Sequence, residues 1–427
     1  MLMDFLFSDS IYWWLGGLLL WMALVLVCLY LIRWRYFPLA HKYAGWQREA
    51  QVIEVATHSA LYNLPPAKAT VYPFVTIVVP ARNQVVHLER LLPCLLEQKY
   101  AGRFEVIVSD QLSTDETDEL LQRLQVQYRS LRVTHVPQSS RHIELRKLAI
   151  SLGIKAAHSE WVIVVNPETK PNNDRWLQHF AEHFLPEINF IEAYYNYESN
   201  GSQRARRAIL ERIYAFTNRL EAYEEGIVLG SEMSNYAVRR SWFLEQRGFA
   251  DSLLLPFGEE ALLAFHHVTP ECCTMLCSED TRLTEQLPTV GVLKMRRVMD
   301  AEVKRRLRGV SWRTSYRWKF ATMLFHLFAL SFVTYALLRT LQLIQTATYD
   351  LNWIYLDLIA LLLFGIFLFL PAYCLRRSLQ ALGEATYGPY LFFYECFRPW
   401  YSLGVSIQRF LHRKEFVRKY LCQAVER

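Results

Sequence analysis

The sequence lacks the glycine-rich loops by which many folds hold nucleotides. No Gly-x-Gly-x-x-Gly segment follows its first predicted strand, and no Gly-Lys-Ser/Thr segment occurs in its 427 residues. Both motifs need their glycines so that backbone amides can approach a phosphate closely. The dinucleotide-binding and P-loop classes are therefore excluded.

Cysteine is present but is not arranged for metal binding. Eight cysteines are scattered along the chain, and the cluster of Cys272, Cys273 and Cys277 has no zinc spacing with histidine partners. We interpret all eight as reduced thiols, which is typical of a cytosolic domain.

Long apolar runs predict three transmembrane helices, over residues 11–32, 320–338 and 353–375. Hydrophobic residues make up 52% of the chain, and each run approaches or exceeds the roughly 20 residues that a bilayer requires. The first run is not typical of a signal peptide, because Asp4 and Asp9 precede it instead of a basic cluster and no small-residue cleavage site follows.

Basic residues beside these runs predict the topology. Arginines and lysines follow the first run, precede the second and follow the third, whereas the link from 342 to 352 has none. By the positive-inside rule, residues 1–10 and the link lie outside the cytoplasm. The domain between the first two runs and the tail over 376–427 are then cytoplasmic.

Strand and helix patterns alternate between residues 71 and 293, after a juxtamembrane connector over 33–70. Apolar strands are predicted over 74–79, 104–108, 131–136, 161–165 and 190–195, with helices between them. Ser113 and Glu116 have the spacing of a capping box at the start of one helix. This alternation indicates an α/β fold with a mostly parallel sheet and flanking helices.

Polar residues follow three of these strands at the point where each ends. They are Asn83, Asp110 with Gln111, and Asn166 with Glu168. Ligands of open α/β sheets bind beyond the carboxyl ends of the strands. These side chains therefore predict one shared crevice, although Asn166-Pro-Glu168 alone is also typical of an ordinary turn.

Two adjacent carboxylates, Glu259 and Glu260, stand at a predicted helix start in the second half of the domain. Acidic groups in a first turn are favoured by the helix dipole. The pair is thus open to two interpretations, plain helix capping or a chemical role.

The order and spacing of these features resemble the inverting glycosyltransferases of family 2, specifically bacterial membrane-anchored members with the GT-A fold. The resemblance runs from about residue 73 to 306. Its motifs are the opening strand and loop Val75-Thr-Ile-Val-Val-Pro-Ala-Arg-Asn83, Phe104-Glu-Val-Ile-Val-Ser-Asp110 with Ser113-Thr-Asp115, the helix segment Arg146-Lys-Leu-Ala149, the strand and loop Trp161 to Pro171, and Gly258-Glu-Glu260.

The resemblance implies a role for each matching residue. Glu260, or Glu259, would be the catalytic base, and Glu168 would be a ligand of Mg²⁺ or Mn²⁺. The nucleotide-sugar would be bound by Pro80, Ala81, Asn83, Asp110, Gln111, Lys147 and Asn166. The acceptor side would include Ser234, Asn235, Lys294 and Arg297.

The chain departs from the family pattern at several of these positions. Asn166-Pro-Glu168 replaces the metal-binding Asp-x-Asp, Gln111 and Glu260 stand where the family has Asp, and Lys294-Met-Arg-Arg297 matches Gln-x-x-Arg-Trp only in part. Hard cations prefer carboxylate oxygens, so a loop with one carboxylate should bind a divalent metal more weakly.

Two functions remain open at this point. The first is a glycosyltransferase of the bacterial inner membrane that moves a sugar from a nucleoside diphosphate to a lipid-linked or cell-envelope glycan acceptor. The second is a catalytically inactive scaffold that partners another envelope glycan enzyme. A processive polysaccharide synthase is disfavoured, because three spans are too few for a channel.

Basic residues cluster beside the membrane spans. The segment from Lys294 to Lys319 has ten lysines or arginines interleaved with apolar residues, and the tail has a similar pattern. Both are typical of interfacial amphipathic helices on anionic lipids. No nucleic-acid motif accompanies them, so nucleic acid is not an expected partner.

Overall fold

The computed structural model describes residues 10–36, 38–43, 72–137, 145–230, 234–250, 258–306, 310–346 and 351–411, the last range with gaps at 386, 389, 395–396, 399, 402, 405–406 and 408–409. Contacts divide the chain into two compact units. The first unit comprises Met1–Pro38, Gly309–Gln380 and Ala385–Leu403, and the second comprises the rest.

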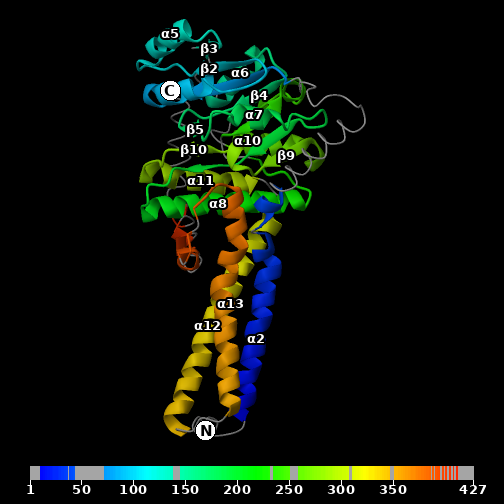
Figure 1. Cartoon of the computed structure of the whole chain (residues 1–427), viewed down its shortest axis with the longest axis vertical. Coiled ribbons are helices and arrows are strands. Elements are labelled where there is room, and N and C mark those ends of the chain that lie inside the picture. The colour runs from blue at the N-terminus through cyan, green and yellow to red at the C-terminus, as the bar shows by residue number, and fades with distance from the viewer. Residues whose placement is uncertain are drawn as a thin grey trace, which may run out of the picture. The chain divides into compact units, whose positions relative to one another are not determined.

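The first unit is built on three long helices that lie side by side (Figure 1). They are α2 (Ser10–Ile32), α12 (Val310–Thr346) and α13 (Leu351–Ala381). Three segments long and apolar enough to cross a membrane coincide with them: Ile11–Tyr36, which continues past the end of α2, Phe320–Ile344 within α12 and Trp353–Ala381 within α13. The expectation of three such helices is confirmed, and α12 and α13 are longer than predicted.

A charged network joins α12 to α13. Arg339 Nε donates to both carboxylate oxygens of Asp357, at 3.0 and 3.1 Å, and Tyr335 Oη donates to Oδ1 at 2.9 Å. The Arg339 guanidinium also lies 4.7 Å from the ring centroid of Trp353. Because isolated charges are costly in apolar surroundings, this pairing favours one register between the two helices.

The second unit contains a seven-stranded sheet in the order β3-β2-β1-β4-β8-β6-β9. All pairings are parallel except those of β8, which runs antiparallel to both of its neighbours. The predicted mostly parallel sheet is thus confirmed. The strands are β1 (Val75–Ala81), β2 (Phe104–Asp110), β3 (Leu131–His135), β4 (Trp161–Val164), β6 (Phe190–Ala193), β8 (Tyr236–Arg239) and β9 (Cys273–Leu276).

Helices cover both faces of this sheet. Every residue of β1 is buried, and its side chains alternate between two apolar clusters: Ile77 and Val79 join one, and Val78 joins the other. The first cluster includes residues of α4 (Val85–Leu96), α5 (Thr117–Gln127) and α7 (Trp176–Ala181). The second includes residues of α6 (Leu145–Ala156), α9 (Arg240–Glu245) and α10 (Glu259–His267).

A second, three-stranded sheet was not predicted. It consists of β5 (Thr169–Pro171), β10 (Leu283–Glu285) and β7 (Tyr195–Tyr197), in the order β5-β10-β7. Strands of three residues are too short to produce a periodic pattern in the sequence. In its register, Glu285 lies opposite Thr169 on one side and Tyr197 on the other.

Two predicted helix details need correction or restriction. Helix α5 begins at Thr117, so Ser113 is not its cap, and Asp115 instead accepts a hydrogen bond from Thr117 N. The basic helix predicted over 294–319 falls on the end of α11 (Val290–Arg306) and the start of α12, and residues 307–309 lie outside the described residues. The part of the predicted tail helix beyond residue 411 also lies outside them.

The described part of the chain also contains the long helix α8 (Gln203–Glu224) and three short 3-10 helices. The hydroxyl of Ser202 caps α8 by accepting from Ala205 N. The 3-10 helices are Trp34–Tyr36, Pro270–Cys272 and Glu279–Thr281.

The contact between α6 and the sheet requires glycine at position 153. A Cβ atom there would lie 2.5 Å from Val78 Cγ1 and 2.7 Å from Ser109 Oγ. We expect Gly153→Ala to lower the free energy of unfolding by about 1–3 kcal/mol, because the core cannot accept the added volume. Gly291→Ala, in α11 with nothing within 4 Å of the added atom, should be neutral or stabilising in the same denaturant titration. Equal effects of both changes would contradict the proposed close packing.

Candidate functional site

The loops that follow β1 and β2 are hydrogen-bonded to each other. Asn83 N donates to Ser113 Oγ at 2.9 Å, and Thr114 N donates to Asn83 Oδ1 at 2.8 Å. Asn83 adopts a positive φ of 49°, a conformation that asparagine tolerates better than most residues. Gln111 N donates to Ala81 O at 2.9 Å, so the predicted nucleotide-binding residues of these two loops lie at one edge of the sheet.

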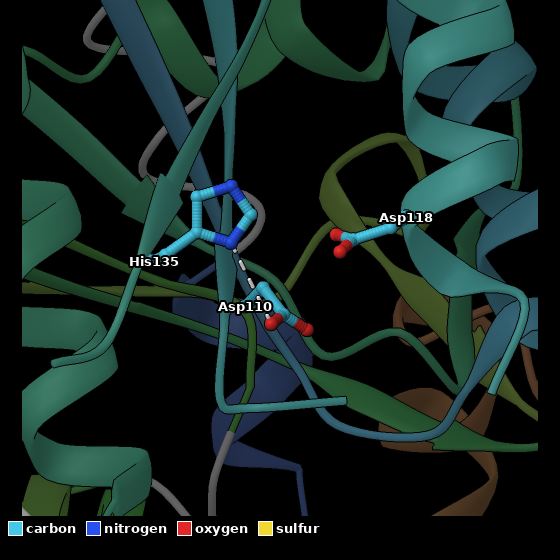
Figure 2. A group of neighbouring side chains, drawn as sticks. All are labelled: Asp110, Asp118 and His135. Atoms are coloured by element: carbon cyan, nitrogen blue, oxygen red, sulfur yellow. Dashed lines mark ion pairs between the residues drawn. The ribbon is translucent and has the colours of Figure 1, made fainter. Parts of the chain in front are cut away.

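Asp110 ends β2 and belongs to a group that could hold a metal ion. Its carboxylate, that of Asp118 in the first turn of α5 and the imidazole of His135 offer ligand atoms within 4.8 Å of one another. Figure 2 shows the three side chains converging, with Nδ1 of His135 3.7 Å from Asp110 Oδ2. Sequence reasoning missed Asp118 and His135, although His135 also ends a parallel strand and the same argument would have included it.

The end of β4 lies beside the start of β8 because these two strands are antiparallel. Asn235 N donates to Val164 O at 3.1 Å, and Asn166 N donates to Ser234 Oγ at 3.1 Å. The Asn235 side chain donates to the carbonyl of Tyr194 at 2.8 Å. Ser234 and Asn235, expected on the acceptor side, are therefore buried directly against the loop expected to bind the donor.

Glu168 follows in the same loop and is held by two donors. Arg296 Nη2 donates to its Oε2 at 2.6 Å, and Gln84 Nε2 donates to its Oε1 at 3.4 Å. Arg296 comes from α11, and Gln84 comes from the loop after β1. The carboxylate is 27% exposed, so solvent and ligands can still reach it.

Glu285 of β10 also contacts Arg296. Its carboxylate is fully buried between two arginines. Arg212 Nη2 donates to its Oε2 at 2.7 Å, and Arg296 Nη1 donates to its Oε1. Burial raises the pKa of the Glu285 carboxyl, but the opposing charges of Arg212 and Arg296 outweigh burial and hold that pKa below its usual value. The Arg212 guanidinium also lies 3.8 Å from the ring centroid of Tyr197.

Glu260 is fully buried in the first turn of α10 and faces an arginine. Nη2 of Arg146, in α6, lies 3.7 Å from its Oε1, and Nη1 of the same guanidinium donates to Asn166 Oδ1 at 2.9 Å. Gly230 packs closely against the first turn of α10, since a Cβ there would lie 2.8 Å from the carbonyl oxygen of Glu260. The side chain of the neighbouring Glu259 lies outside the described part of the chain.

Three other predicted site residues lie on the helices α6 and α11. Lys147 is buried within α6, and its neighbour Arg146 makes the contact with the β4 loop. Lys294 is exposed, and Arg297 donates to Glu211 of α8 at 2.7 Å. Arg296, which lies between these two residues, contacts the strand-end loop by donating to Glu168.

The Mg²⁺ or Mn²⁺ expected at Glu168 does not fit the side chains as they are arranged. Both Glu168 oxygens and Asn166 Oδ1 already accept hydrogen bonds, two of them from guanidinium groups. A divalent cation would have to displace these donors or lie against their positive charge. No step below depends on a metal at this position.

Residues 76–247 match the family described as Glycosyl transferase family 2. The resemblance to the family 2 glycosyltransferases is therefore confirmed over this segment, which contains β2, β3, β4, β6 and β8 together with Asp110, Asn166 and Glu168. The match also agrees with the expectation that the chain is an enzyme of the transferase class.

Individual relatives are distant. A chondroitin synthase from Escherichia coli is 28% identical over 117 residues, which is 27% of this chain and only 16% of that protein. The mannosyltransferase PcManGT from Pyrobaculum calidifontis, solved with GDP-Man and Mn²⁺, superposes with a TM-score of 0.44 at 15% identity, covering 81% of this chain and 99% of that one. TarS from S. aureus superposes with a TM-score of 0.36 at 13% identity, over 72% of this chain and 54% of that one.

The charge pairs of Glu285 predict an acid-sensitive component of stability. A carboxyl with a lowered folded-state pKa stabilises the fold above its ordinary pKa of 4.5, and this contribution is lost as the pH falls through the folded-state value. Glu285→Gln should therefore cost about 3–5 kcal/mol near pH 7, because it leaves buried guanidinium charge uncompensated. The deficit relative to wild type should shrink below pH 4.5.

Denaturant titrations at several pH values would measure this difference. Glu89→Gln removes an exposed carboxylate that pairs with Arg123 at 3.1 Å, and it should change stability by no more than about 1 kcal/mol. A pH-independent deficit for Glu285→Gln would refute the assignment.

Proposed function

We propose that this chain transfers a sugar from a nucleoside-diphosphate donor to a hydroxyl group of an acceptor. The observation that carries the proposal is the position of Arg146, which contacts both Asn166 and Glu260. One guanidinium thus spans from the strand-end loop expected to bind the donor diphosphate to the carboxylate expected to accept a proton. The sugar donor and the acceptor hydroxyl of a transfer reaction would meet beside this guanidinium.

The proposed reaction follows from the chemistry of these groups. The Glu260 carboxylate removes the proton of the acceptor hydroxyl as its oxygen attacks the anomeric carbon of the sugar. The bond from that carbon to the diphosphate breaks, and the nucleoside diphosphate leaves with the electron pair. Attack opposite the leaving group inverts the anomeric centre. The Asp110 and Gln111 loop is proposed to bind the nucleoside, with the Gln111 amide oxygen accepting from the base.

The membrane spans support an acceptor that is itself lipid-linked or part of an envelope glycan. We propose that α2, α12 and α13 cross the bacterial inner membrane, with the second unit and the C-terminal tail on the cytoplasmic side. Basic residues flank each span on that side, and anionic lipids would attract them. No feature of the described residues favours the alternative of an inactive scaffold for another envelope enzyme.

Replacement of the proposed base tests the reaction. In Glu260→Gln, release of UDP or GDP from a panel of sugar donors in the presence of membrane extract should fall by on the order of a hundredfold or more. Binding of the same nucleotides should be retained, because Glu260 acts on the acceptor. Glu245→Gln, which changes an exposed carboxylate on α9, serves as the control. Unchanged turnover in Glu260→Gln would exclude this base, and no turnover of any donor by the wild type would favour the scaffold.

Labelling of single cysteines tests the topology. In a cysteine-depleted chain, Thr348→Cys in the link between α12 and α13 should react with a membrane-impermeant maleimide in intact cells. Glu187→Cys, at an exposed position of the second unit, should react only after the cells are opened. The reverse pattern would invert the proposed orientation.

A further inference from the structure

We propose that this protein binds the diphosphate of its donor without a divalent cation, and that the guanidinium of Arg296, assisted by Arg146, supplies the positive charge. The inference rests on the proposed function and concerns the same crevice. It follows from what the side chains of the β4 loop already contact.

Each residue that replaces the Asp-x-Asp pair is held by its own arginine. Arg146 donates to Asn166 Oδ1 at 2.9 Å, and Arg296 donates to Glu168 Oε2 at 2.6 Å. The two arginines come from different helices, α6 and α11. Arginine remains protonated at any physiological pH, so neither contact can be relieved by loss of a proton.

Six charged side chains linked at the loop carry equal numbers of positive and negative charges before any ion is added. Arg146, Arg212 and Arg296 are positive, and the carboxylates that they contact, Glu168, Glu260 and Glu285, are negative. A divalent cation at Glu168 would leave this partly buried group with an excess of two positive charges. A diphosphate, in contrast, brings negative charge to guanidinium groups.

Arg296 is positioned for such a ligand. Its guanidinium forms an ion pair with the buried Glu285, and its side chain remains 17% exposed. Of its five N–H donors, the described residues take three, through Glu285, Glu168 and Tyr197 Oη at 3.5 Å. The two others are available to phosphate oxygens, which guanidinium groups bind in a forked geometry.

Glu168 then acts differently from a metal ligand. It holds Arg296 over the loop until a diphosphate with more negative charge takes over part of the contact. In this proposal Glu168 competes with the diphosphate for Arg296, and Arg296 touches the leaving group. This division of roles gives the two residues opposite mutational signatures.

Nucleotide binding by the full-length protein in detergent separates the two modes. Titration calorimetry with UDP and GDP would be performed with EDTA and, in parallel, with Mn²⁺ or Mg²⁺. We expect the dissociation constant of the preferred nucleotide in EDTA to agree within about twofold with the value in metal. Arg296→Gln should weaken binding in EDTA on the order of tenfold or more, because a charge-assisted contact is lost.

Glu168→Gln gives the decisive comparison, because Arg296 keeps its anchor on Glu285 in that variant. Binding in EDTA should be unchanged or tighter, since the guanidinium no longer has a competing carboxylate. Arg123→Gln breaks an exposed ion pair elsewhere and should behave as the wild type. These binding measurements do not require turnover or a known acceptor.

Two results would overturn the inference, and they differ from each other. Affinity that rises tenfold or more with Mn²⁺ or Mg²⁺, and loses that rise in Glu168→Gln, would show that a metal displaces Arg296 while leaving the proposed transferase function intact. Failure of UDP and GDP, and of their sugar conjugates, to bind under any condition would refute donor binding itself, and the proposed function would fail with it.

Discussion

The centre of the second unit depends on the neutralisation of Glu285. A buried carboxylate is tolerated only when opposite charge and hydrogen bonds replace its lost hydration. Arg212 of α8 and Arg296 of α11 provide both. Because Glu285 belongs to β10, which pairs with β5 and β7, this one compensation connects two helices to the small sheet.

The same compensation determines the chemistry available at the edge of the large sheet. Strand β5 begins one residue after Glu168, so the small sheet fixes where the β4 loop turns back. Arg296, held by Glu285 on one side, reaches Glu168 on the other. In the proposed reaction, a residue that supports the fold would thereby also place a permanent positive charge beside the leaving diphosphate, where preorganised charge is most effective.

The antiparallel strand β8 brings a second group of residues to this edge of the large sheet. A parallel strand at that place in the sheet would bring its start to the opposite edge, away from the end of β4. The reversed direction of β8 puts Ser234 and Asn235 against Asn166. Helix α10, which carries Glu260, shares an apolar cluster with β8. Residues of the β4 loop and of the β8 start, which are distant in the chain, become neighbours through this single change of direction.

Much of this arrangement could be predicted from local patterns. The strands β1, β2, β3, β4 and β6, the three apolar helices and the strand-end positions of Asn83, Asp110 and Asn166 follow from hydrophobic periodicity, length and turn residues, which act over a few neighbouring positions. The family resemblance was also visible at this level. The prediction failed for β5, β7 and β10, which are too short to have a period. It also failed for the Ser113 cap, because the Ser113 hydroxyl accepts a hydrogen bond from the backbone amide of Asn83 in another loop.

The sequence by itself thus determined which elements form, which segments are apolar enough to span a membrane and which strand ends meet at one edge of a parallel sheet. Only the tertiary structure decided which basic residues reach that edge. Arg146 rather than Lys147, and Arg296 rather than Lys294 or Arg297, contact the loop. The reason is geometric: neighbouring residues of a helix point about 100° apart, so a shift of one position separates a side chain that contacts the loop from one that points elsewhere.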